Sequence, residues 1–127
     1  MKEYVAYKGN AFCIEWYYDV NGNSEALRFF NKLSCSQQRK ILMLFKRMGD
    51  NGKIMDATKF RNEGDKIYAF KPKPHRFLSF FYSGQKIIVT NAFTKKTQKL
   101  PENEKMRALA YKADYEKRNK EGRYYEA

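Results

Sequence analysis

Four residues near the middle of the sequence could act together on a phosphate: Lys71, Lys73, His75 and Arg76. Lys71 and Lys73 lie two positions apart, so they would point the same way from an extended backbone. Arg76 could clamp a phosphate through two parallel hydrogen bonds, and His75 could act as an acid or a base. The alternative is a solvated connection between two strands that has no chemical role.

A second basic cluster contains Lys95, Lys96, Thr97 and Lys99. It directly follows a segment that favours a strand, and loops at the ends of sheets are common sites of function. The alternative is a basic surface loop. If the strands between the two clusters form a hairpin, the clusters come close together in space.

A third set contains Arg107, Tyr111 and Tyr115, which lie at steps of four on one face of an expected helix. A tyrosine in this place could stack on a nucleobase or act as an acid. Alternatively, both rings pack the helix against a sheet.

The first two clusters share a segment that has no acidic residue. Residues 66–101 hold eight Lys or Arg residues and no Asp or Glu, whereas the rest of the chain holds 18 basic and 14 acidic residues. A basic stretch with interspersed aromatic residues is typical of a surface that binds nucleic acid. The segment carries seven such residues: Tyr68, Phe70, Phe77, Phe80, Phe81, Tyr82 and Phe93.

This composition restricts the chemistry. Residues 66–101 contain no carboxylate cluster of the kind that holds Mg²⁺ in two-metal nucleases. The sequence also offers no Ser/His/Asp set and no glycine-rich phosphate loop. A nuclease with this site would use the RNA 2′-hydroxyl as the nucleophile, with no cofactor or metal, and fixed cations would stabilise the charge on the phosphate. A lysine could then act as the base if neighbouring cations lower its pKa.

The whole chain restricts the kind of protein. Its 127 residues suit a single domain (residues 1–127), and a hydrophobic content of 43% indicates a folded protein. The net charge of +12 favours an anionic partner such as RNA, DNA, an acidic protein or a membrane surface. No apolar run approaches the roughly 18 residues that span a bilayer, and no signal-peptide core is visible, so we expect a cytoplasmic protein. Cys13 and Cys35 match no metal or redox motif, and we expect both to be free and buried.

The first half of the chain predicts one strand and a helical hairpin. Residues 11–18 are rich in strand-favouring side chains. A helix follows that Asn23 or Ser24 can cap, and Gly49 can end the second helix. Residues 50–65 are expected to be irregular.

The second half predicts an antiparallel meander and a final helix. Three strand-like segments with short links lie at residues 66–71, 76–82 and 86–93. The helix begins near Glu102, and the tail after it is expected to fray. Together these elements predict an α+β fold with a core at about residues 11–116, in which the first strand joins the meander and the helices cover one face. The apolar stripe expected on the final helix is Met106, Leu109, Ala110 and Ala113.

The segment KIYAFKPKPHRFLSFFYSGQKIIVTNAFTKKTQKLPENE resembles the signature of RelE/ParE-superfamily toxins, in particular the HigB-like, phage-derived branch. That branch shows a strand ending in Arg or Lys, a short turn, and a Tyr-Arg pair that opens the next strand. A glycine turn and a hydrophobic strand then lead into a Phe-x-Lys-Lys-Thr loop, a proline and a final helix. With the upstream helical hairpin, the resemblance covers roughly residues 11–116. The matching positions are Lys71, His75, Arg76, Gly84, Phe93, Thr94, Lys95, Lys96, Thr97 and Pro101.

The resemblance implies the toxin of a type II toxin–antitoxin pair, an endoribonuclease that cuts mRNA in the decoding site of the ribosome without a metal. It also implies a small antitoxin partner, often with a helix-turn-helix domain. Arg76 would hold the scissile phosphate, and Lys71 with Lys95 or Lys96 would supply charge and proton transfer. The further candidates for RNA contacts are Lys73, His75, Thr97, Lys99, Arg107 and Tyr111.

The chain departs from the pattern of that branch at three places. Ala69 stands where a carboxylate is usual, Pro72-Lys73-Pro74 replaces a glycine-rich turn, and His75 replaces a tyrosine. Two other functions stay open: a ParE-like inhibitor of DNA gyrase, and a non-catalytic module that binds RNA or DNA. A gyrase inhibitor would be expected to lack the basic clusters, which this chain keeps.

Overall fold

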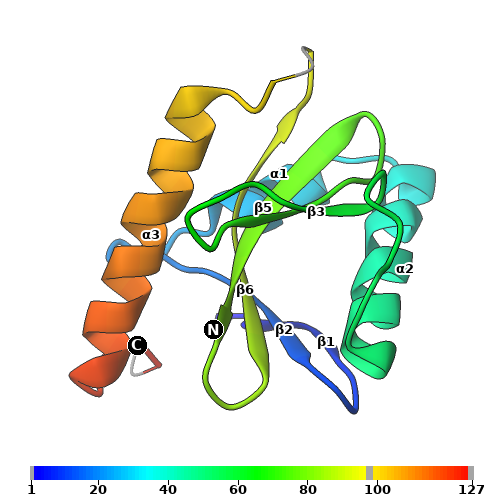
Figure 1. Cartoon of the computed structure of the whole chain (residues 1–127). Helices are drawn as coiled ribbons and strands as arrows, with labels where there is room; N and C mark the ends of the chain where they lie inside the picture. The colour runs from blue at the N-terminus through cyan, green and yellow to red at the C-terminus, as the bar shows by residue number, and fades with distance from the viewer. Residues whose placement is uncertain (1, 97–98, 126–127) are drawn as a thin grey trace.

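The computed structural model describes residues 2–96 and 99–125, and this part of the chain forms an α+β fold with a six-stranded mixed sheet and three helices (Figure 1). The order of elements confirms the predicted strand, helical hairpin, meander and C-terminal helix. In chain order they are β1 (Val5–Lys8), β2 (Cys13–Trp16), α1 (Glu25–Asn31), α2 (Cys35–Asn51), β3 (Phe60–Asn62), β4 (Tyr68–Phe70), β5 (His75–Tyr82), β6 (Lys86–Thr94) and α3 (Glu102–Lys120).

The sheet has the strand order β1-β2-β6-β5-β4-β3. Strands β4, β5 and β6 form the predicted antiparallel meander. Strand β2 joins the β6 edge in parallel, because the helical hairpin carries the chain back across the sheet before the meander begins. The prediction of an irregular segment at residues 50–65 is wrong at β3, which adds to the other edge of the meander. Strand β1 was not predicted either.

The sequence suggested that Gly49 ends α2, and this prediction is wrong. The helix continues to Asn51 and ends at Gly52, which adopts the left-handed conformation with φ of 79°. Gly49 instead lies where the β1–β2 turn crosses the helix. A Cβ on Gly9 would lie 2.2 Å from the carbonyl carbon of Gly49, and the backbone N–H of Ala11 donates to the Gly49 carbonyl at 2.8 Å. Two glycines are therefore needed for this close approach.

Helices cover both faces of the sheet, so the prediction that they cover one face is wrong (Figure 1). On one face α1 and α2 pack over Trp16 and Phe77. On the other face α3 packs over Leu78 and Phe80. Because successive side chains of β5 point to opposite faces, this strand is buried on both sides from His75 to Phe80.

Only Leu109 of the stripe predicted on α3 packs against the core on that face of the sheet. Met106 is 58% exposed, while Ala108, Tyr115 and Arg118 are buried. The tyrosine ring supplies the large apolar surface that the helix buries, and the alanines of the predicted stripe face solvent. This result agrees with the alternative in which Tyr115 packs the helix against the sheet.

The C-terminal tail is packed, so the prediction that it frays is wrong for the residues up to 125. Tyr124 is only 2% exposed, and its hydroxyl accepts a hydrogen bond from the backbone N–H of Tyr18 at 2.8 Å. Arg118 donates to the carbonyl of Tyr18 at 2.6 Å and to the carboxylate of Asp114. The end of α3 is thus tied to the segment that follows β2.

The structure also bears on two further expectations, which concern membrane-spanning segments and the two cysteines. No helix in the described part of the chain is long and apolar enough to cross a membrane. Cys13 and Cys35 are free thiols, but Cys13 is half-buried and Cys35 is exposed. Cys35 is exposed because it opens α2 on the surface, so the expected burial of this residue is wrong.

We predict that Tyr124→Ala lowers the free energy of unfolding by about 3–5 kcal/mol, because it removes a buried aromatic ring and leaves a cavity. Urea unfolding of the purified protein measures the change. The control is Arg123→Ala, which alters the exposed neighbouring side chain and should change stability by less than about 0.5 kcal/mol. Equal unfolding midpoints for the two variants would show that the tail is not packed.

Candidate active site

The antiparallel pairing of β5 and β6 places the first two basic clusters side by side. Arg76 lies opposite Phe93 in this ladder. The backbone N–H of Lys95 donates to the carbonyl of Pro74 at 2.9 Å. The connection before β5 and the loop after β6 therefore leave the sheet next to each other.

Side-chain alternation sets the face on which the cations lie. Ala69 and Leu78 pack in the core beneath α3. Residues two positions apart on a strand share a face, so Lys71 and Arg76 extend the same face toward the end of the sheet. Arg61 lies opposite Ala69 in the β3–β4 ladder and belongs to this face as well. The sheet thus presents several cations at the end where α3 begins.

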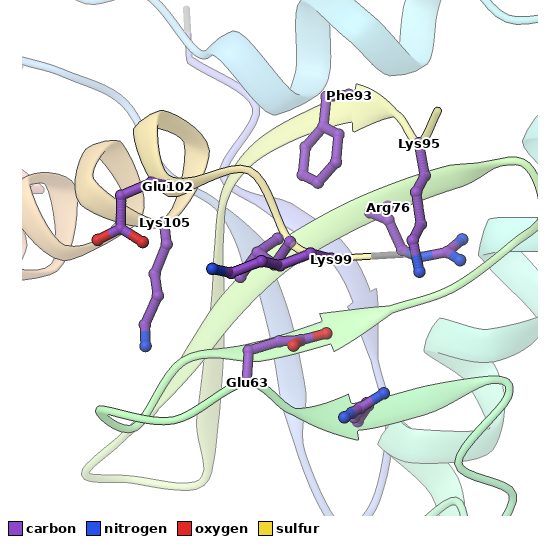
Figure 2. A pocket seen from close by; sticks show the side chains of 9 residues that line it. Glu63, Arg76, Phe93, Lys95, Lys99, Glu102 and Lys105 are labelled. Carbon is purple, nitrogen blue, oxygen red and sulfur yellow. The ribbon is translucent and has the colours of Figure 1, made fainter. Parts of the chain in front are cut away.

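Two hollows open at this end of the sheet, and Arg76 and Lys95 line both of them. The first, named here the Glu63 hollow, has a volume of about 250 Å³ (Figure 2). The second, named the Lys73 hollow, has a volume of about 600 Å³. The Glu63 hollow is also lined by Arg61, Glu63, Phe93, Lys99, Leu100, Glu102 and Lys105, and the Lys73 hollow by Thr58, Lys71, Lys73, Pro74 and Lys96.

Arg76 and Lys71 are both almost fully buried, with 7% and 8% of their surface exposed. Arg76 donates one hydrogen bond to the carbonyl of His75 at 2.8 Å. The ammonium of Lys71 donates to the carbonyl of Ala57 at 3.1 Å. These neutral acceptors fix both side chains and leave further N–H groups of each for a ligand.

The charge of these two buried cations is not neutralised by an ion pair. Within residues 2–96 and 99–125, no carboxylate forms a salt bridge with Lys71, Arg76 or Lys95. Burial lowers the pKa of Lys71, and the nearby charges of Arg76 and Lys95 lower it further. Burial also lowers the pKa of Arg76, against a smaller opposing effect of Glu63. A buried cation without a counter-ion favours the binding of an anion.

His75 lies on the opposite face of the sheet from its neighbour Arg76. Its Nδ1 is 3.1 Å from Oγ1 of Thr94, and its ring meets Phe29 of α1 edge-on, with 5.3 Å between ring centres. Its Nε2 is buried and has no hydrogen-bond partner among the described residues. Burial lowers the pKa of His75, followed by the charges of Lys40 and Arg76. The structure does not bring this imidazole into either hollow.

Arg107 and Tyr111 are also placed away from the two hollows, where they join α3 to α1. Arg107 forms a salt bridge of 2.8 Å with Glu25, and the Tyr111 hydroxyl donates to the same carboxylate at 2.9 Å. Burial and this hydrogen bond raise the pKa of Tyr111 to about 12. The ring of Tyr111 lies 4.8 Å from that of Tyr17, centre to centre. These contacts position the helix.

Of the other sequence candidates, Lys73 and Lys96 line the Lys73 hollow and Lys99 lines the Glu63 hollow. Thr97 lies outside the described residues. In the described part of the chain, no group of three or more His, Cys, Asp and Glu side chains could hold a metal ion.

The sequence missed Arg61, Glu63 and Lys105 as site residues. Arg61 and Glu63 were missed because β3 has three residues and no apolar alternation, so nothing in the sequence marks it as a strand. Glu63 lies two positions after Arg61 and just before the acid-free segment (residues 66–101). It places a carboxylate beside the cations of that segment in the hollow. Lys105 reaches the hollow from the first turns of α3 and pairs with Asp65 at 2.8 Å.

Comparison with known proteins gives one family. The model of a family described as "Phage derived protein Gp49-like (DUF891)" matches residues 28–112. This span runs from α1 into α3 and includes the residues that line both hollows. A comparison with curated proteins gave no match.

We predict that Lys71→Met raises the free energy of unfolding by about 0.5–2 kcal/mol, because it removes a buried charge that has no counter-ion among the described residues and keeps the apolar stem. Chemical denaturation at pH 7 measures the change. Lys96→Met is the matched control, since Lys96 is exposed in the same site and its loss should change stability by less than about 0.5 kcal/mol. A loss of stability in Lys71→Met would show that the charge is compensated.

We also predict that His75 makes the protein less stable at acidic pH. Because its pKa in the folded protein lies below the ordinary value of 6.5, its contribution is fully present above that value and is lost as the pH falls below it. Unfolding measured between pH 8 and pH 5 should therefore show a steeper loss in the wild type than in His75→Gln, which cannot titrate. Parallel curves for the two proteins would contradict the buried, neutral state of this imidazole.

Proposed function

Because this chain belongs to the Gp49-like family of phage-derived proteins, which is associated with the toxins of toxin–antitoxin pairs, we propose that it is the toxin of a type II pair and cuts mRNA on the ribosome. The observation that carries the catalytic part of this proposal is the pair of buried cations, Lys71 and Arg76, at the wall of an open hollow, which form no salt bridge within residues 2–96 and 99–125. Such a site is arranged for a phosphate that arrives with its own negative charge.

Arg76 binds the scissile phosphate in this mechanism. Its guanidinium is held from behind by the carbonyl of His75 and lines both hollows. As the 2′-hydroxyl attacks, negative charge grows on the non-bridging phosphate oxygens. The fixed guanidinium stabilises that charge without having to reorganise, and its burial strengthens the interaction.

Lys71 is the general base. Its lowered pKa increases the fraction of neutral amine that can take the proton of the 2′-hydroxyl. The new bond from the 2′ oxygen to phosphorus forms as the bond from phosphorus to the 5′ oxygen breaks. Lys95 or Lys96, which line the same hollow, donates a proton to that leaving oxygen. The products are a 2′,3′-cyclic phosphate and a 5′-hydroxyl, and no step requires a metal ion.

The substrate is a single strand that runs along a basic path. Lys73 lines the Lys73 hollow and also a groove of about 360 Å³ against α2. Lys40, Arg47 and Lys59 line that groove too. A chain of phosphates can therefore pass from the scissile position toward α2 with cations beside it.

The partners follow from the same charge. A net charge of +12 favours binding to the ribosome and its mRNA in the cytoplasm, and association driven by it weakens as salt increases. A cognate antitoxin, of the helix-turn-helix type that the resemblance implies, would neutralise the toxin by covering or distorting the site.

We predict that Arg76→Ala slows mRNA cleavage by roughly 10²- to 10³-fold, as expected when one preorganised donor to a developing charge is removed. Cleavage is measured as the rate of new 5′ ends on mRNA in a translating extract, and the same variant should relieve growth arrest in cells. Arg123→Ala, which removes an exposed arginine paired with Glu121, should cut at the wild-type rate. Arg76→Ala must also unfold in the same cooperative way as the wild type, so that a loss of cleavage cannot be due to misfolding.

Two outcomes would contradict this function. Full toxicity of folded Arg76→Ala would remove Arg76 from the mechanism. Efficient cutting of naked mRNA by the wild type, at the rate seen on translating ribosomes, would exclude ribosome dependence.

A further inference from the structure

We propose that the Glu63 hollow is a base-recognition pocket that selects guanine in the nucleotide next to the phosphate held by Arg76. This inference rests on the proposed function, since it concerns the same RNA strand. It assigns a role to β3, which the mechanism above does not use.

The size and position of the hollow suit one nucleobase. Its volume of about 250 Å³ lies below the roughly 300–1,000 Å³ of pockets for drug-sized ligands, so it holds a single ring system. Arg76 and Lys95 separate it from the Lys73 hollow. A nucleotide whose phosphate contacts this shared wall has its base within reach of the Glu63 hollow.

An aromatic ring supplies a surface for stacking. Phe93 is 9% exposed and lies at the end of the α3-side core, so its position is fixed by packing. In Figure 2 the ring of Phe93 extends from β6 toward the hollow, and Glu63 lies on the opposite side of the hollow. Leu100 adds a second apolar contact to the wall. Proteins that bind single-stranded RNA hold bases in this way, with one face on an aromatic side chain and the edge available for hydrogen bonds.

Glu63 is the group that reads the edge of the base. Its carboxylate makes no hydrogen bond or salt bridge with any described residue, although it lines a hollow together with Arg61, Lys99 and Lys105. The fold therefore keeps this acceptor available beside several cations, with Glu102 as a second carboxylate in the lining of the hollow. A carboxylate can only accept hydrogen bonds, so it selects a ligand that presents donors.

Guanine is the base whose pairing edge matches these groups. It presents two adjacent donors, N1–H and the N2 amino group, which a carboxylate can accept in parallel. Adenine, cytosine and uracil each offer a donor beside an acceptor, which the carboxylate would repel. Arg61 lies two residues before Glu63 and lines the same hollow, so its guanidinium can donate to O6 of the same edge.

The test is a binding measurement that does not depend on cleavage. Guanosine 3′-monophosphate, adenosine 3′-monophosphate and inorganic phosphate are titrated into the purified protein by calorimetry. We expect the wild type to bind the guanosine nucleotide about 10-fold more tightly than the adenosine nucleotide, as a bidentate pair provides. Glu63→Gln should bring the two affinities within about 2-fold and leave phosphate binding unchanged, since its amide presents a donor in place of one acceptor. Glu116→Gln, remote on α3, should keep the wild-type preference.

Three results would overturn the inference: equal binding of the two nucleotides by the wild type, a guanosine preference that survives Glu63→Gln, or nucleotide binding no tighter than that of phosphate. These outcomes are distinct from failure of the proposed function. A guanine preference that depends on Glu63, in a protein that does not cut mRNA, would support the pocket and refute the nuclease. Cleavage of mRNA by a protein that shows no guanine preference would support the nuclease and refute the pocket.

Discussion

The burial of Lys71 and Arg76 without a carboxylate partner is the constraint around which the rest of this structure is arranged. Each cation is held by a backbone carbonyl, and neither forms a salt bridge within the described residues. Burying charge in this way costs stability, because water no longer solvates it. The two hydrophobic cores, one on each face of the sheet, bury the apolar surface that offsets this cost. In the proposed function, an anionic substrate that enters the hollow would supply the missing negative charge.

The helices on the two faces of the sheet are fixed in different ways. On one face, α2 ends beyond Gly49, whose lack of a side chain lets the β1–β2 turn lie against the helix. On the other face, α3 is fixed at its far end by Arg118 and Tyr124 and near its start by the salt bridge between Lys105 and Asp65. Since both ends of α3 are tied, the helix forms a wall of the Glu63 hollow without filling it.

The sequence predicted the meander, the helical hairpin and the meeting of two basic clusters, because these follow from local patterns and from the pairing of consecutive strands. It could not predict β3, whose three residues owe their strand conformation to pairing with β4. Glu63 was missed with it, although the acid-free segment drew attention to the absence of carboxylates. The tail was expected to fray because its charges are typical of a solvated end, whereas Tyr124 packs against residues more than a hundred positions away.

In the proposed mechanism, fixed cations promote attack by the RNA 2′-hydroxyl on the adjacent phosphate. The most direct test is mass spectrometry of the ends of mRNA cut by the purified protein on programmed ribosomes, with the cut itself made under conditions that deplete free divalent ions as far as the ribosomes tolerate. Attack by the 2′-hydroxyl predicts a 2′,3′-cyclic phosphate on the upstream fragment and a 5′-hydroxyl on the downstream fragment. A 3′-hydroxyl with a 5′-phosphate would contradict it, because those ends require attack by water.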